Sequence, residues 1–194
     1  MHIFFSRKIN CGEFFQGVGD PINFSQDYII LLQHPVTTEY GDGLNQITKT
    51  LQAISKLKKK IQVIGLWPNP DAGSDDISKG IRILRENKND FKMRFFRNFA
   101  PEDFLKILNN SSCIVGNSSA GIRESSFMGV PSINIGSRQN SRERASNVVD
   151  VPYDVNKIYK AINYQINRKY KKSNIYGDGS AGKNIARILS RVDL

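Results

Sequence analysis

Residues 112–135, SCIVGNSSAGIRESSFMGVPSINI, hold two short apolar runs separated by a segment with helical character. The first run, residues 112–115, is strand-sized, and a helix is expected from about residue 120 to residue 128. Residues 131–135 form a second strand-sized run. Strand, helix and strand in this order are typical of parallel pairing, because parallel strands need a crossover connection. The segment therefore predicts one unit of a parallel α/β sheet.

The same alternation continues on both sides of this segment. Strands are expected at residues 28–32, 61–67, 92–96 and 147–151, and helices at 43–58, around 77–84, from 101, at 155–167 and at 181–191. We predict an α/β fold, a Rossmann-like parallel sheet with helices on both faces. In such sheets ligands bind beyond the carboxyl ends of the strands, so the strand-to-helix turns are where functional residues are sought.

The amino-terminal stretch differs from the rest of the chain. Residues 1–27 contain Gly12, Gly17 and Gly19 and show no clear periodicity. We expect them to be a lead-in or hinge rather than part of the sheet. Residues 28–194 are expected to form a single Rossmann-like domain.

Composition narrows the class of protein. The 194 residues include 39% hydrophobic and 24% charged side chains, which is typical of a globular chain rather than a disordered one. No apolar run approaches the ~18 residues of a membrane span, and the first residues lack a signal-peptide cleavage site. Two cysteines give no disulfide framework, which fits a reducing cytoplasm. We therefore predict a cytoplasmic location and no membrane partner.

The net charge of +10 favours anionic ligands without naming one. Basic residues concentrate at 56–60 and 168–172, where helix carboxyl ends are expected and cations stabilise the helix dipole. Aromatic and basic residues are not interleaved as they are on nucleic-acid-binding surfaces, so no nucleic-acid partner is expected.

The turn VGNSSAGIRE, residues 115–124, is the most informative of the strand ends. Ser118 and Ser119 stand where a helix begins, and free N–H groups and hydroxyls there suit a phosphate group. Plain N-capping by a serine is an equally good explanation. Glu124, one turn further on, could accept both hydroxyls of a ribose, or act only as an acid at the helix start.

Other strand ends also carry candidate ligand-binding residues. His34 follows the 28–32 strand, where an imidazole could bind phosphate as a cation or transfer a proton. A lone histidine is, however, more often structural. Asn69 and Asp71 lie in the turn after the next strand, and Arg138 follows the 131–135 strand, where a guanidinium suits phosphate or a surface ion pair.

Several kinds of chemistry find no support in the sequence. No His, Cys or Asp cluster has metal-ligand spacing, so no metal is expected. Neither a G-x-S-x-G elbow nor a Walker phosphate loop is present. We predict no cofactor.

Five turn motifs together resemble a known family: QHPVTTE at 33–39, WPNPDAGS at 67–74, VGNSSAGIRE at 115–124, GVPSINIGSRQ at 129–139 and YGDGSAG at 176–182. In this order they are similar to hydrolysing UDP-N-acetylglucosamine 2-epimerases of the sialic-acid pathway. The resemblance covers about residues 28–190. It implies a GT-B-type fold, of which this chain would be the carboxyl-terminal, nucleotide-holding half. Residues 28–194 would then be its nucleotide-binding domain, and residues 1–27 a remnant of the hinge or of the amino-terminal half.

The resemblance also implies roles for individual residues. It predicts that UDP is bound by His34, Asn69, the backbone around Phe99, Ser118, Ser119, Glu124 and Arg138, with His34 also the catalytic candidate. The implied reaction converts UDP-N-acetylglucosamine and water to N-acetylmannosamine and UDP through a 2-acetamidoglucal. Most of the carboxylates that act on the sugar would come from an amino-terminal half, which we expect to be missing and to be needed in cis or in trans.

Two alternatives stay open at this point. The chain could be the carboxyl-terminal half of a GT-B glycosyltransferase, although the 33–39 and 67–74 turns argue against it. It could also be a non-catalytic module that binds nucleotide sugars. Besides the UDP-sugar and the other half, a second copy of the chain is a candidate partner.

Overall fold

The computed structural model describes residues 17–57, 61–86 and 92–192. These residues form a seven-stranded sheet in the order β1-β4-β3-β2-β5-β6-β7. The strands are β1 (Gly17–Gly19), β2 (Tyr28–Leu32), β3 (Gln62–Leu66), β4 (Met93–Phe96), β5 (Cys113–Gly116), β6 (Ser132–Ile135) and β7 (Val148–Val151). All neighbouring strands pair in parallel except β1, which is antiparallel to β4.

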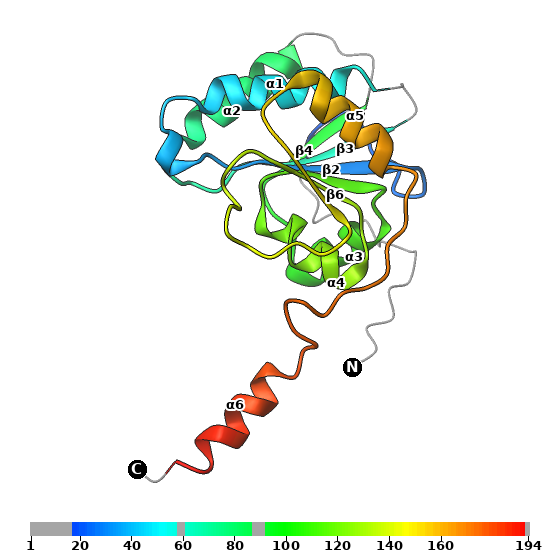
Figure 1. Ribbon diagram of the computed structural model, residues 1–194. Helices are drawn as coiled ribbons and strands as arrows, with labels where there is room; N and C mark the ends of the chain where they lie inside the picture. The colour runs from blue at the N-terminus through cyan, green and yellow to red at the C-terminus, as the bar shows by residue number, and fades with distance from the viewer. Residues whose placement is uncertain (1–16, 58–60, 87–91, 193–194) are drawn as a thin grey trace.

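Helices cover both faces of this sheet (Figure 1). They are α1 (Gly43–Ser55), α2 (Ser74–Glu86), α3 (Pro101–Asn110), α4 (Glu124–Met128), α5 (Val155–Gln165) and α6 (Ala181–Leu189), with short 3-10 turns η1 (Thr37–Glu39) and η2 (Ser119–Gly121). The predicted fold class, a parallel α/β sheet with helices on both faces, is confirmed.

Each face of the sheet has its own hydrophobic core. Ile29 and Leu31 of β2 pack with α1, α2 and α5, whereas Ile30 packs with α3 and η2 on the opposite face. Successive side chains of a strand point to opposite faces, so a strand covered on both sides must be apolar throughout. The fully buried run YIILL of β2 has this pattern, and it lies at the centre of the sheet.

The chain changes direction across the sheet between β2 and β5. From β2 it proceeds through β3 to β4 on one side, and then returns to β5, β6 and β7 on the other. The carboxyl ends of β2 and β5 are therefore neighbours, and the loops that follow them diverge. Such a switch point is where open α/β sheets bind ligands.

The prediction that residues 1–27 lie outside the sheet is wrong for Gly17–Gly19. These residues pair with Arg94, Phe95 and Phe96 of β4 as an edge strand. The pairing uses backbone groups of a short, glycine-containing segment, so no side-chain periodicity announces it. Residues 1–16 lie outside the described part of the chain.

The predicted helix at 120–128 is interrupted. A 3-10 turn, η2, comes first, and α4 begins only at Glu124. The hydroxyls of Ser125 and Ser126 donate hydrogen bonds to the carbonyls of Gly121 and Ile122, which lie four residues earlier. Serine side chains that bond back in this way compete with regular helix and bend it.

Helix α6 is where it was predicted, but it does not cover the sheet. It stands clear of the sheet and its helices in Figure 1, and none of its residues is buried. That residues 28–194 form a single domain therefore stays a prediction. No helix in the described part of the chain is long and apolar enough to cross a membrane.

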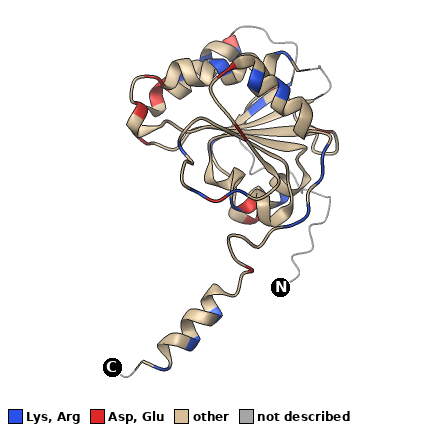
Figure 2. Ribbon diagram, viewed as in Figure 1, with Lys and Arg blue, Asp and Glu red and all other residues tan. Residues whose placement is uncertain are grey.

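Basic side chains are spread over the molecule. Figure 2 shows them on the outer helices, on the segment after α5 and on α6. Lys56 follows the end of α1, and Arg168 follows α5 with its guanidinium 3.7 Å from the ring centroid of Tyr164. Both predicted clusters thus follow helix ends, although residues 58–60 lie outside the described residues.

Candidate functional site

A glycine brings the two central strand ends together. Gly116, the last residue of β5, pairs with Leu32, the last residue of β2. Its φ of +136° is one that side chains rarely adopt, and a Cβ there would lie 2.1 Å from the Leu32 carbonyl oxygen. Only glycine therefore allows the loop after β5 to turn this close to the loop after β2.

The next residue, Asn117, joins three loops through buried hydrogen bonds. Its Oδ1 accepts from the His34 backbone N–H at 2.7 Å, and its Nδ2 donates to the His34 carbonyl at 2.8 Å. The Asn117 carbonyl accepts from Gln139 Nε2 at 2.7 Å and from Arg138 Nη1 at 3.3 Å. The loops after β2, β5 and β6 are thus tied together at the switch point.

His34 is 5% exposed, and its ring is held by the loop after β3. The backbone N–H of Asn69 donates to His34 Nδ1 at 3.1 Å. Nδ1 is therefore an acceptor, and the proton of a neutral imidazole lies on Nε2. Burial, with a smaller contribution from the nearby Arg138 guanidinium, lowers the pKa of His34 to about 4, although Asp71 acts in the opposite direction. In the free chain at pH 7 His34 is therefore a neutral hydrogen-bond donor rather than a cation.

A pocket of about 250 Å³ opens beside this ring at the carboxyl ends of the strands. It brings together five of the predicted site residues, His34, Asn69, Ser118, Ser119 and Arg138. The other residues that line it are Leu32, Leu66, Trp67, Arg97, Asn98, Phe104 and Ala120.

Ser118 and Ser119 face this pocket with both backbone and side-chain donors. The Ser118 hydroxyl accepts from the Ala120 N–H at 3.3 Å, so the capping contact that was considered as an alternative is present. A hydroxyl oxygen that accepts one bond keeps its own O–H to donate. The backbone N–H groups of both serines have no acceptor among the described residues. The turn thus combines a cap with unused donors.

Phe99 and Glu124 do not line the pocket with these five residues. Phe99 is 5% exposed and packs on Phe96, with ring centroids 4.7 Å apart. Glu124 begins α4, and its Oε2 is buried without a hydrogen-bond partner among the described residues. A buried acceptor with no partner is costly, and a ligand hydroxyl would satisfy it.

Sequence reasoning missed Arg97, Asn98 and Trp67, which line the pocket from the ends of β4 and β3. All three follow strands that end at the same edge as β2 and β5. Arg97 and Asn98 come directly after the predicted 92–96 strand, which was the available signal, whereas Trp67 was expected to be the last residue of the 61–67 strand. Asp178, in contrast, only holds its own turn, where the Ser180 N–H donates to it at 2.9 Å.

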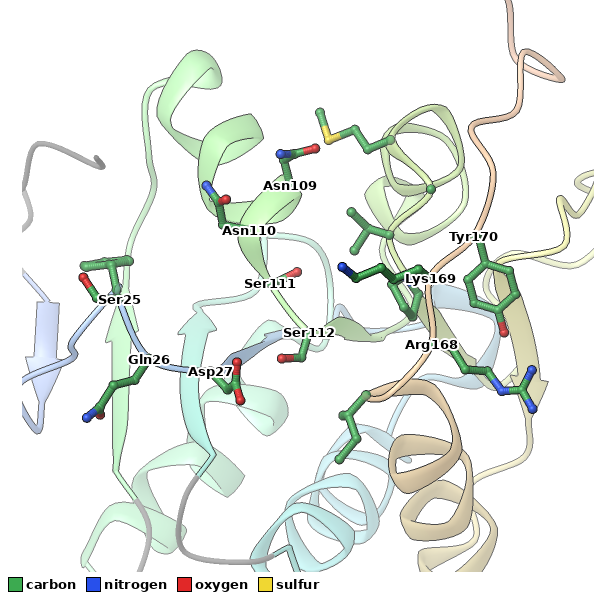
Figure 3. Close-up of a pocket in the computed structure, with 16 residues that line it drawn as sticks. Ser25, Gln26, Asp27, Asn109, Asn110, Ser111, Ser112, Arg168, Lys169 and Tyr170 are labelled. Carbon is green, nitrogen blue, oxygen red and sulfur yellow. The ribbon is translucent and has the colours of Figure 1, made fainter. Parts of the chain in front are cut away.

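A larger cavity of about 740 Å³ lies at the opposite edge of the sheet (Figure 3). It is lined by residues 24–27 before β2, 109–112 before β5, 128–131 before β6, and Ile166 and 168–170 after α5. None of the predicted site residues reaches it. We assign the site to the smaller pocket, because ligands of parallel α/β sheets bind at the carboxyl edge.

Metal chemistry has no candidate site in residues 17–57, 61–86 and 92–192. No group of three or more His, Cys, Asp or Glu side chains in these ranges is placed to hold an ion. The pocket instead offers guanidinium, imidazole, amide and hydroxyl donors, a set that suits an anionic ligand.

The fold and the pocket define a Rossmann-like α/β domain with a polar, anion-suited site at the switch point of its sheet. The chain belongs to the UDP-N-acetylglucosamine 2-epimerase family, whose sequence profile matches residues 13–190. The resemblance noted from the turn motifs is confirmed at this level. Membership of this family also argues against the glycosyltransferase alternative.

Two curated proteins resemble the chain over most of its length. It is 33% identical over 166 residues to UDP-N,N'-diacetylbacillosamine 2-epimerase (hydrolyzing) of Legionella pneumophila, covering 85% of this chain and 43% of the relative. It is 33% identical over 167 residues to polysialic acid biosynthesis protein P7 of Escherichia coli, covering 84% and 42%. The chain thus spans less than half the length of these relatives.

Solved structures show the same fold. UDP-GlcNAc 2-epimerase from Neisseria meningitidis, bound to UDP-GlcNAc, superposes with a TM-score of 0.70 at 16% identity, covering 88% of this chain and 46% of that chain. The Methanocaldococcus jannaschii enzyme, in complex with UDP-GlcNAc and UDP, gives a TM-score of 0.68 at 21% identity, covering 86% and 46%. The chain therefore has the fold of one half of these GT-B-like structures, as predicted.

Proposed function

We propose that this chain is the nucleotide-holding, carboxyl-terminal half of a hydrolysing UDP-N-acetylglucosamine 2-epimerase. The observation that carries the proposal is the convergence of His34, Ser118, Ser119 and Arg138 on one pocket at the switch point. These residues come from three separate loops in a chain of this family. The pocket supplies donors to an anion, as a diphosphate requires.

In this proposal Ser118, Ser119 and Arg138 bind the diphosphate. The buried Glu124 Oε2 accepts hydrogen bonds from the ribose hydroxyls, which gives this carboxylate the partners that it lacks in the free chain. Asn69 and the backbone around Phe99 are proposed to face the nucleotide part of the UDP-sugar rather than its sugar. Each of these contacts is a proposal, supported by the chemistry of the side chain and its place at the carboxyl edge.

His34 is proposed to act on the leaving group. Elimination removes the C2 proton of the sugar and breaks the C1–O bond, with the electron pair of that bond going to the departing UDP oxygen. A neutral imidazole with its proton on Nε2 donates to the phosphate oxygens and stabilises this developing charge. Water then adds to the 2-acetamidoglucal to give N-acetylmannosamine.

Removal of the C2 proton is proposed to need residues outside this chain. The pocket of about 250 Å³ is smaller than the roughly 300–1,000 Å³ that usually encloses a ligand of this size. The base at C2 is assigned to an amino-terminal half, supplied in cis or in trans. Without that base held at C2, the chain binds the nucleotide but gives little rate.

The identity of the sugar and of the pathway is inferred only from the names of the relatives. The Escherichia coli relative is a polysialic acid biosynthesis protein, which supports a role in amino-sugar or sialic acid synthesis. The Legionella relative is named a UDP-N,N'-diacetylbacillosamine 2-epimerase. UDP-N-acetylglucosamine and UDP-N,N'-diacetylbacillosamine are therefore both substrates to test. A cytoplasmic location, a second copy as partner and the absence of nucleic-acid partners stay predictions.

Proton NMR of UDP-N-acetylglucosamine mixed with this chain tests the proposal. We expect saturation transfer to the uracil and ribose protons, with no N-acetylmannosamine formed by the chain alone. The Ser118→Ala, Ser119→Ala double variant should lose the transfer. Turnover by this chain alone would contradict the assignment of the base to another half. Transfer that survives the double variant would contradict the site.

A further inference from the structure

The loop that carries His34 has few backbone partners of its own. Strand β2 ends at Leu32, and Pro35 follows His34 and has no N–H to donate. Buried backbone groups beyond a strand end need hydrogen-bond partners from elsewhere. Both backbone groups of His34 find theirs in a single side chain, that of Asn117, which lies 83 residues away in the sequence.

The side chain of Asn117 is suited to this role. It is 0% exposed, and its amide presents one acceptor and one donor side by side, which match the N–H and C=O of one residue. Aspartate would lack the donor, and alanine would lack both groups. The distances of 2.7 and 2.8 Å are those of well-formed hydrogen bonds.

The main chain of Asn117 acts on the other side of the pocket. Its carbonyl accepts from Arg138 and from the 1% exposed Gln139, both of which follow β6. One residue therefore contacts the loop of the imidazole with its side chain and the guanidinium with its backbone. Gly116, which precedes it, fixes where this residue lies.

We propose that Asn117 is a positioning residue that holds the His34 imidazole and the Arg138 guanidinium in the arrangement in which they receive a diphosphate. The proposal rests on the proposed function for its ligand, but the arrangement itself is a property of the free chain. Asn117 touches neither the sugar nor the phosphates in this account. It acts through His34 and Arg138.

The test compares Asn117→Ala with Asn147→Ala. Asn147 is a matched control, because it is 1% exposed and also bridges segments, bonding Ser125 Oγ and the Val130 carbonyl. It precedes β7 and so lies at the other end of the strands. Three quantities are measured for each variant: the melting temperature, the NMR titration of the His34 ring and the affinity for UDP.

For Asn117→Ala we expect the His34 ring to titrate closer to 6.5 than the value of about 4 in the native chain, because the released loop becomes hydrated. The charged neighbours Arg138 and Asp71 remain in this variant. UDP affinity should fall roughly 30-fold. Asn147→Ala should lower the melting temperature but leave the titration unchanged and the affinity within about twofold.

Asn117→Asp keeps the proposal testable if the alanine variant does not fold. It retains the acceptor for the His34 N–H, loses the donor to the His34 carbonyl and adds a negative charge. We expect a His34 titration above that of the native chain and weaker UDP binding. A folded Asn117 variant with native titration and native UDP affinity would overturn the proposal. If the native chain binds no UDP, the proposed function fails, while the titration still decides the role of Asn117.

Discussion

The two edges of the central sheet differ in what they hold. At the amino edge a cavity of about 740 Å³ lies among strand starts and helix ends. Its hydrogen bonds are of the ordinary end-of-element kind, such as Ser112 N–H to the Tyr28 carbonyl at 2.8 Å. At the carboxyl edge the pocket is only about 250 Å³, but it adjoins the buried amide of Asn117 and a buried histidine whose pKa is lowered to about 4.

The difference teaches that buried polar groups mark a site better than volume does. Burying a polar side chain, or keeping an imidazole neutral by burial, costs stability. Such unfavourable features are concentrated at ligand-binding and catalytic sites. The lining of the amino-edge cavity also includes a left-handed glycine, Gly129 with φ of +73°, but none of its described lining residues is a buried polar or charged side chain. The predictions below test this contrast, from the largest expected effect to the smallest.

Gly116→Val should be the most damaging change. A Cβ at this position meets the Leu32 carbonyl oxygen at 2.1 Å in a conformation that valine avoids. We expect a loss of about 3–5 kcal/mol in the free energy of unfolding, measured in urea. The control is Gly177→Val, where φ is +106° but nothing lies within 4 Å. Equal losses in the two variants would mean that crowding at the strand end contributes nothing.

Replacing Ser118 and Ser119 together by alanine should weaken UDP binding about 100-fold, because two hydroxyl donors to a charged group are lost. Calorimetry measures the affinity, and urea unfolding should show a change of no more than about 1 kcal/mol. An unfolded double variant would show instead that the serines serve mainly as caps.

Acidification should destabilise the free chain through His34. The unfolded imidazole takes up a proton below about pH 6.5, whereas the folded one does so only near pH 4, so the unfolded state binds more protons between these values. Stability therefore falls as the pH drops through this window. Between pH 6.5 and pH 4 we expect the free energy of unfolding to fall by about 2–3 kcal/mol less in His34→Gln than in the native chain. Parallel curves for the two proteins would place the imidazole in a solvated setting.

Glu124→Ala should weaken the binding of a nucleotide but not the binding of pyrophosphate, which has no ribose. We expect UDP to bind about 10-fold more weakly, while inorganic pyrophosphate is bound within about twofold of the native affinity. The reason is that this carboxylate is assigned to the ribose hydroxyls. Equal losses for both ligands, measured by calorimetry, would remove that assignment.

The smallest effects come from a matched pair of exposed cations, one at each edge. Arg97 lines the carboxyl-edge pocket and Lys169 lines the amino-edge cavity. Arg97→Ala should weaken UDP about fivefold, since an exposed cation contributes modestly, and Lys169→Ala should have no measurable effect. A loss confined to Lys169→Ala would move the site to the other edge of the sheet.

The sequence predicts the sheet well because its strands are short apolar runs between turns. The run at 28–32 is buried on both faces, and glycine, proline and serine mark the turns that follow. The edge strand Gly17–Gly19 escaped prediction because it pairs through its backbone. The break before α4 was missed because serine hydroxyls bond back to the chain, an effect with no periodic signature.

The residues that line the candidate pocket were predictable in type but not in arrangement. Candidates such as His34, Ser118 and Arg138 could be chosen because each follows a strand that ends at the same edge, whereas Asn69 was assigned through the family resemblance. The neutral state of His34 and the bonds by which Asn117 ties the loops together depend on contacts between distant residues. Such contacts leave no local pattern in the sequence.

The central claim is that the carboxyl edge of this sheet binds a uridine nucleotide. Calorimetric titration of UDP into the chain, with ADP as the control nucleotide, tests it most directly. The account predicts saturable binding of UDP that is tighter than that of ADP and is lost in the Ser118→Ala, Ser119→Ala variant. Binding of neither nucleotide, or UDP binding unchanged by the double substitution, would contradict it.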